Sequence, residues 1–121
     1  MAQESGRVTA VLEAYVLLRV GRENRIDCLI DTGFSGALVL PKEFVAGLEA
    51  IEVGRELFNV VGGKQMEADI VLAEVEWLGA SRLLRAIVSE GEDALIGTEL
   101  LDGTVLTIDY IDATVTVTKP E

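Results

Sequence analysis

Asp31 is the residue whose surroundings in this sequence most favour chemistry. Two apolar runs, residues 28–30 and 38–40, flank it, and Thr32 and Gly33 follow it directly. The glycine permits a tight turn in which backbone N–H groups point at the carboxylate. Because a carboxylate at the tip of a buried loop loses solvation, it must accept hydrogen bonds or share a proton. The pattern therefore predicts a carboxylate prepared for acid/base chemistry.

Carboxylates must carry any acid/base chemistry because the sequence contains no histidine. That absence excludes Ser-His-Asp and Cys-His catalysis, and also zinc sites with histidine ligands. Cys28 is the only cysteine, so neither an internal disulfide nor a cysteine metal cluster can form. Its apolar neighbours predict a core thiol rather than a nucleophile. We therefore expect no metal and no cofactor.

The composition limits the class of protein and its partners. The chain has 121 residues, 50% of them hydrophobic, and we expect residues 1–121 to form one domain. The formal charge of −11 disfavours nucleic acid and anionic membrane surfaces, because both select basic patches. The N-terminus lacks the apolar core of a signal peptide, and no apolar run is long enough to span a bilayer. The sequence thus predicts a cytoplasmic protein without a membrane partner.

Strand-forming residues recur in short stretches between turns, which predicts an all-β fold. Strands are expected over residues 25–30, 38–40, 70–77, 83–88, 105–108 and 115–117, with one long or bent strand, or a hairpin partner, over 8–20. A hairpin over residues 56–67 has Gly62 and Gly63 at its tip, a dipeptide suited to a turn with positive φ. Short helices are expected over residues 42–48 and 98–101. The expected architecture is a small, partly closed β-barrel with one or two short helices.

Two landmarks give the sequence a family resemblance. The first is Cys-Leu-Ile-Asp-Thr-Gly, residues 28–33, which leads into a second apolar run that ends at Pro41. The second is Leu95, Ile96 and Gly97, followed by a short helix and a strand, with the glycine-tipped hairpin between the two landmarks. In this order they resemble a retropepsin-like, single-domain aspartic protease, and we expect a prokaryotic member. The resemblance covers residues 7–118 and implies the acid-protease type of β-barrel.

The resemblance also implies a catalytic loop made of Asp31, Thr32 and Gly33. The Gly33 N–H would hold the carboxylate, and Thr32 would brace two such loops across a two-fold axis. Aspartic endopeptidases hold a water between two carboxylates that share one proton. The sequence contains a single Asp-Thr-Gly, so one chain cannot complete the pair. A homodimer with one Asp31 from each subunit is therefore expected.

The substrate implied by the resemblance is an extended peptide bound in β-strand form. Phe34 and Ser35 would shape the subsites nearest the catalytic loop. The hairpin would act as a flap that closes over the peptide. Its expected binding residues are Val60, Val61, Gly62, Gly63 and Lys64.

Three positions depart from the family pattern. Phe34 stands where alanine or serine commonly follows the motif, so a larger side chain must fit beside the loop. Retroviral members carry an acidic residue and an arginine that pair near the dimer interface, at the places of Ser35 and Thr98. Both partners are replaced together, so no unpaired charge results.

Two other functions are compatible with the sequence. A binding module could keep the fold and the loop and recognise an extended peptide without cutting it. A Ser-Lys hydrolase could use Ser35 or Ser89 with Lys42 or Lys64, although no spacing supports that arrangement. The intact Asp-Thr-Gly favours the endopeptidase.

Overall fold

The computed structural model describes residues 2–59 and 62–120. Within these residues 61% of the chain is strand and 8% is helix, which confirms the all-β fold class. The strands are β1 (Ala2–Val8), β2 (Ala14–Val20), β3 (Asn24–Ile30), β4 (Leu38–Pro41), β5 (Ile51–Asn59), β6 (Gln65–Trp77), β7 (Ala80–Ser89), β8 (Ala94–Ile96), β9 (Val105–Asp109) and β10 (Thr114–Lys119). The helices are α1 (Lys42–Ala46) and α2 (Thr98–Leu101).

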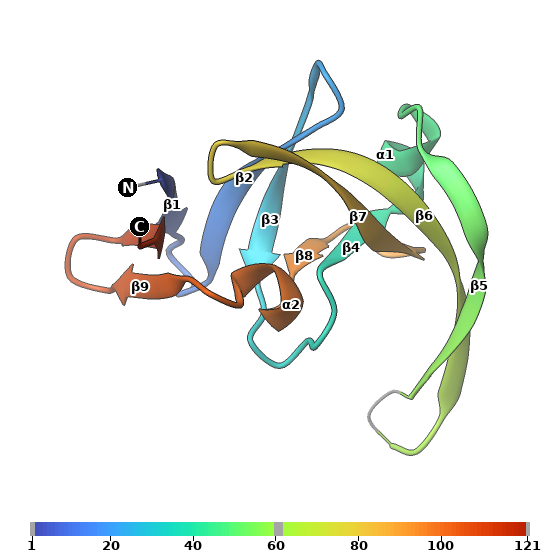
Figure 1. Cartoon of the computed structure of the whole chain (residues 1–121). Helices are drawn as coiled ribbons and strands as arrows, with labels where there is room; N and C mark the ends of the chain where they lie inside the picture. Colours follow the sequence, from blue (N-terminus) through green and yellow to red (C-terminus); the bar gives the residue numbers. More distant parts are fainter. Residues whose placement is uncertain (1, 60–61, 121) are drawn as a thin grey trace.

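Six of the described strands close a small barrel (Figure 1). They follow one another in the order β2, β3, β8, β4, β7 and β6, and β6 pairs with β2 to complete the ring. This closing contact is short, with Arg19 opposite Glu76 and Val20 opposite Val75. Beyond the ring, β5 extends the sheet from β6, and β1, β10 and β9 extend it from β2. The expected β-barrel is confirmed.

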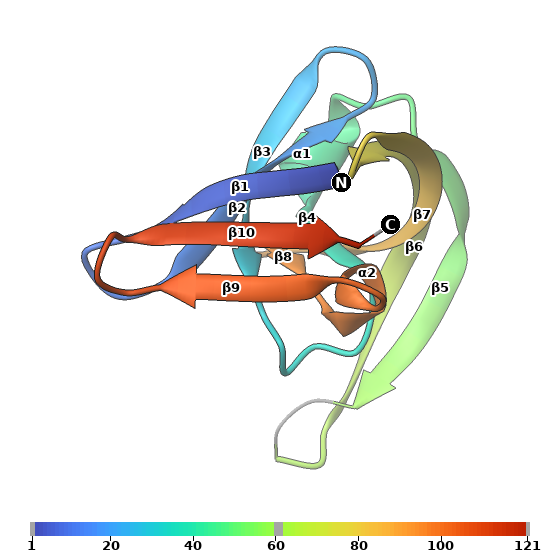
Figure 2. The ribbon, with the colours of Figure 1, turned by 60° about the vertical axis from the view of Figure 1, so that its left-hand side comes forward.

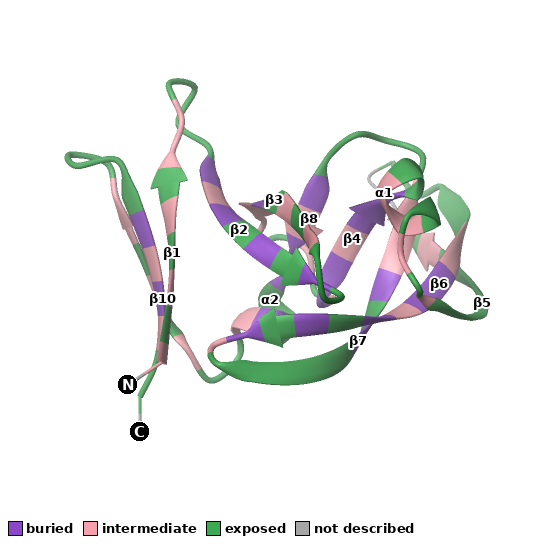
Figure 3. Cartoon of the chain, turned by 90° about the horizontal axis from the view of Figure 1, so that it is seen from above, coloured by how far each residue is buried: buried purple, intermediate pink, exposed green. Residues whose placement is uncertain are grey.

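The alternation of apolar residues along the strands builds the interior of the barrel (Figure 3). Every second residue of β2 is buried from Ala14 to Val20, and every second residue of β6 from Val71 to Trp77. The glutamates between the buried positions of β6 are exposed. Because successive side chains of a strand point to opposite faces, this pattern fixes which face of each strand forms the core.

The two terminal strands pair with each other inside one chain. β1 and β10 are antiparallel, with a register that runs from Ala2 opposite Lys119 to Arg7 opposite Thr114. β9 continues this sheet and forms its outer edge, so that β1, β10 and β9 lie side by side (Figure 2). The polar sequence of β1 gave no strand signal before residue 8, and its pairing with β10 holds it in the sheet.

Residues 8–20 do not form one continuous strand. A turn over residues 9–13 separates β1 from β2, and β2 then forms the expected hairpin with β3. The carbonyl O of Thr9 accepts a hydrogen bond from Leu12 N at 2.9 Å, and its Oγ1 accepts one from Glu13 N at 3.2 Å. Leu12 has a φ of 65°, which breaks the extended backbone. Its apolar side chain is 68% exposed, so hydrophobicity was a misleading strand signal here.

The expected hairpin over residues 56–67 is part of a longer one. Its second arm and the separately expected strand over 70–77 form the single strand β6. β5 begins at Ile51 and pairs with β6 up to Asn59, which lies opposite Gln65. Neither helix of the described chain is long and apolar enough to cross a membrane.

Candidate active site

The loop that carries Asp31 begins where β3 leaves the barrel. Asp31 N donates a hydrogen bond to Ile96 O at 2.9 Å, which continues the parallel pairing of β3 with β8. Gly33 N donates to Asp31 Oδ1 at 2.9 Å, and Phe34 N donates to Asp31 O at 3.1 Å. The turn therefore holds one carboxylate oxygen through the backbone N–H that the sequence pattern predicted. The other oxygen, Oδ2, has no hydrogen bond within the described residues.

Gly97 lets the segment between β8 and α2 pass directly under this loop. Its N–H donates to Ala37 O at 3.0 Å. A Cβ at this position would collide with Gly36 O and would lie 2.6 Å from Phe34 O. The first residues of α2 continue the attachment, because Thr98 N donates to Phe34 O at 2.8 Å and Glu99 N donates to Gly36 O at 3.2 Å. The two landmarks of the sequence are thus joined by a set of backbone hydrogen bonds.

The loop presents its polar residues at the surface of the single chain. Thr32, Gly33 and Ser35 are exposed, and Asp31 is half-buried. No group of three or more His, Cys, Asp or Glu side chains that could hold a metal occurs in the part of the chain that the structure describes.

The β5–β6 hairpin extends from the barrel on the same side as the Asp31 loop (Figures 1 and 2). Gly62 and Gly63 have φ values of 97° and 76°, as expected for a glycine turn, and both are exposed together with Lys64. Val60 and Val61, also expected at the tip, lie outside the described residues.

Ion pairs that the sequence did not predict join the arms of the hairpin. Arg55 Nε lies 2.9 Å from Glu67 Oε1, and Arg55 Nη1 lies 3.1 Å from Asp69 Oδ1. A further ion pair between Arg85 and Glu56 connects the hairpin to β7. Because all these side chains are roughly half exposed, we expect the pairs to set the hairpin's geometry more than its stability.

A cavity of 690 Å³, here called the main cavity, lies between the Asp31 loop and the hairpin. Of the expected site residues, Gly33, Phe34 and Ser35 line it, whereas Asp31, Thr32, Gly62, Gly63 and Lys64 do not. Sequence reasoning missed its apolar wall, which includes Phe58, Met66 and Ile87. The apolar positions in the arms of the hairpin were the available signal, because Phe58 and Met66 are paired across β5 and β6.

Lys42 and Ser89, two residues of the alternative Ser-Lys hydrolase, have other partners among the described residues. Lys42 Nζ lies 3.7 Å from Glu90 Oε1 and forms an ion pair with it. Ser89 Oγ accepts a hydrogen bond from Gly91 N at 2.9 Å. No hydrogen bond in this part of the chain joins Ser35 or Ser89 to a lysine.

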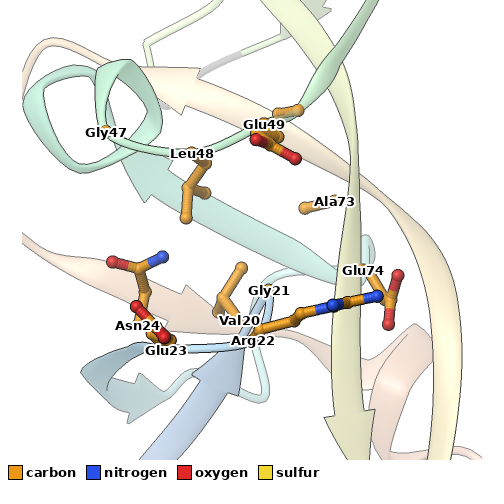
Figure 4. Close-up of a pocket in the computed structure, with 11 residues that line it drawn as sticks. Val20, Gly21, Arg22, Glu23, Asn24, Gly47, Leu48, Glu49, Ala73 and Glu74 are labelled. Carbon is orange, nitrogen blue, oxygen red and sulfur yellow. The ribbon is translucent and has the colours of Figure 1, made fainter.

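A second cavity, of 520 Å³, lies at the other end of the barrel (Figure 4). It opens around the turn between β2 and β3, whereas Asp31 follows the opposite end of β3. Glu23, Glu49 and Glu74 reach it from three separate segments, and none of the expected site residues lines it. It is therefore separate from the Asp31 loop.

Cys28 is fully buried, as its apolar neighbours predicted. Burial, together with the nearby charge of Asp27, raises the pKa of the thiol to about 12. The thiolate is the nucleophilic form of cysteine, so this residue is inert at neutral pH.

Comparisons with known proteins bear on the fold. No protein-family model matches the sequence, and no curated protein matches it. Among solved structures, the chain is similar to the crystal structure of a retropepsin-like aspartic protease from Rickettsia conorii, with a TM-score of 0.68 and 16% sequence identity. The alignment covers 97% of this chain and 90% of that one. The chain thus has the retropepsin-like fold.

Proposed function

We propose that this protein is a homodimeric aspartic endopeptidase in which each subunit contributes one Asp31. The observation that carries the proposal is the Asp31 loop itself. Gly33 N holds Oδ1 at 2.9 Å and leaves Oδ2 without a hydrogen bond among the described residues, on an exposed loop of a retropepsin-like fold. A second copy of the loop, related by a two-fold axis, would bring another such carboxylate to the same place.

The chemistry follows from two carboxylates about 3 Å apart, which cannot both be ionised and therefore share one proton. The ionised carboxylate takes a proton from a water molecule as the water attacks the peptide carbonyl carbon. The protonated carboxylate donates its proton to the carbonyl oxygen. In this proposal Thr32 braces the two loops against each other, and the backbone of Gly33 keeps each Asp31 oriented.

The proposed substrate is an extended peptide that lies between the Asp31 loop and the β5–β6 hairpin. Phe34 and Ser35 line the main cavity beside the loop, and the apolar residues of the hairpin face the same space. The hairpin would then act as a flap, with its glycine turn closing over the peptide. A cytoplasmic location and a prokaryotic source belong to the same proposal and rest on the sequence.

Subunit mixing tests the proposal directly. The wild-type chain should cleave peptides and Asp31→Asn should not, while Asp112→Asn, an exposed carboxylate in the turn between β9 and β10, serves as the matched control. After full exchange with an equal amount of Asp31→Asn, about a quarter of the dimers carry two wild-type loops. Total activity should therefore fall to about half of that of the unmixed wild-type chain.

Dilution and pH give independent readouts. Specific activity should fall below the dimer dissociation constant, and a carboxylate pair with one shared proton should give a bell-shaped pH profile on the acidic-to-neutral side. Because the pI is about 4.3, solubility must be recorded at each pH. A monomer that cuts peptides would refute the shared site. A wild-type chain that binds peptides but never cuts them would identify a binding module instead.

A further inference from the structure

The ring of Phe34 rests on two glycines. A Cβ added to Gly36 would lie 2.5 Å from Phe34 Cζ, and one added to Gly97 would lie 2.5 Å from Phe34 Cδ2. Real Cβ atoms almost never approach that closely, so neither position could carry even alanine without movement of the ring. The ring fills the space that two missing side chains leave open, and tight packing of this kind fixes its position.

This ring forms part of the wall of two cavities. One is the main cavity of 690 Å³. The other, here called the side cavity, has a volume of 140 Å³, and Phe34, Phe58 and Ile87 are among the residues that line both. Phe34 therefore stands between a large space and a small one, both next to the Asp31 loop.

The side cavity has the size and lining of a pocket for one apolar side chain. An apolar cavity of about 150 Å³ holds a single benzene molecule, so a space of 140 Å³ takes an aliphatic side chain but not the ring and methylene of phenylalanine. The buried residues Leu38, Ile70 and Ala86 contribute apolar walls, and the Arg85–Glu56 ion pair adds no net charge. The exposed carboxylate of Glu99 also reaches the lining.

We propose that Phe34 is a specificity-determining residue, whose ring restricts the side cavity to small aliphatic side chains of a bound peptide. The proposal rests on the proposed function, because it assigns the side cavity to a substrate. An extended peptide points alternate side chains to one side, so neighbouring cavities can receive residues two positions apart. The main cavity then accepts a large side chain and the side cavity a small one.

The test compares the wild-type chain with Phe34→Ala on a library of peptides varied at each position. In the wild-type chain, one position should prefer alanine or valine to phenylalanine. In Phe34→Ala this preference should shift towards the bulky side chain by tenfold or more in kcat/KM, because a single methylene already changes discrimination by about 10–200-fold. Leu57→Ala is the matched control, because Leu57 lines the main cavity but not the side cavity. It should leave the preference at that position unchanged.

Gly36→Ala provides a second test that leaves Phe34 in place. No positive φ prevents alanine at this position, and the atoms nearest to its Cβ belong to the ring of Phe34, although Gly36 also lines the side cavity. In the wild-type background the substitution should displace the ring and change the preference at the same peptide position. In the Phe34→Ala background, where the ring is absent, only the volume of the added methyl group remains, and the change in that preference should be several-fold smaller. If Phe34→Ala does not fold by circular dichroism, Phe34→Leu replaces it in both comparisons.

Each outcome decides between the two proposals. An unchanged preference in Phe34→Ala, or the same effect of Gly36→Ala in both backgrounds, would overturn the role of Phe34 while the protease assignment stands. If the wild-type chain binds peptides without cutting them, the protease assignment fails. The tenfold shift is then sought in peptide dissociation constants, which decide the role of Phe34. A chain that neither cuts nor binds peptides would refute both proposals.

Discussion

Replacement of Gly97 by alanine should destabilise the whole protein through the Asp31 loop. The backbone of Gly97, with φ −105° and ψ −178°, is extended and accepts any residue, so the cost comes from lack of space. The new Cβ would collide with Gly36 O and would lie 2.6 Å from Phe34 O and 2.5 Å from Phe34 Cδ2. Both carbonyl groups already accept hydrogen bonds from the start of α2. The Asp31 loop and α2 would therefore have to move apart.

The expected loss can be worked from these contacts. Overpacking of a tight site costs about 1–3 kcal/mol, and the two weakened backbone hydrogen bonds add about 1 kcal/mol each. The free energy of unfolding should fall by about 3–5 kcal/mol, a large share of the roughly 5–15 kcal/mol typical of a domain. Gly47→Ala is the control, because its φ is −88° and the nearest atom to a new Cβ is Phe44 O at 3.6 Å. We expect it to stay within about 0.5 kcal/mol of the wild-type chain.

Urea unfolding at one fixed protein concentration measures both variants. Trp77 is the only tryptophan of the sequence and is 2% exposed, so its fluorescence reports the loss of the core. Fixed concentration matters because dimerisation changes apparent stability. If the free energy of unfolding of Gly97→Ala lay within about 1 kcal/mol of that of Gly47→Ala, the close packing of the two landmarks would be refuted.

Three further outcomes are expected. With a pKa of about 12, the Cys28 thiol should resist iodoacetamide at pH 8 in the native protein and react after unfolding, as mass spectrometry would show; fast labelling of the native protein would contradict its burial. Hydrogen bonds from the backbone N–H groups of Asp112 and Ile111 lower the pKa of Asp109 below its unfolded value of 3.8. The ionised carboxylate therefore stabilises the folded protein at pH values above 3.8, and this stabilisation is lost as the pH falls through the pKa of the folded state. The melting temperature of Asp109→Ala should lie below that of the wild-type chain at pH 7, and this difference should disappear in acid. A difference that does not depend on pH would show that the ionised carboxylate is not the source of the stabilisation. Joint replacement of Gly62 and Gly63 by alanine should cost about 2 kcal/mol through positive φ alone and should lower peptide turnover, whereas unchanged turnover would exclude the hairpin from catalysis.

Local rules explain why parts of the fold could be predicted. The hydrogen bond from Gly33 N to Asp31 Oδ1 spans two residues, so it depends on turn geometry that the sequence encodes directly. The same holds for the glycine turn of the hairpin and for the alternation along β6. The break between β1 and β2 was missed because the turn over residues 9–13 contains Val11 and Leu12, which are apolar yet 74% and 68% exposed. Hydrophobic patterns report strands only where the apolar residues enter the core.

The sequence by itself determined which catalytic groups are absent and how the chain turns at Asp31. The absence of histidine excludes imidazole-dependent catalysis, the single cysteine excludes an internal disulfide, and the residues around Asp31 form their turn through short-range contacts. Only the tertiary structure decided what surrounds that carboxylate. The packing of the Phe34 ring against Gly36 and Gly97 brings together residues from two distant segments. The main and side cavities form where the hairpin meets the barrel. Such contacts depend on how whole strands pack in space, which a pattern of neighbouring residues does not specify.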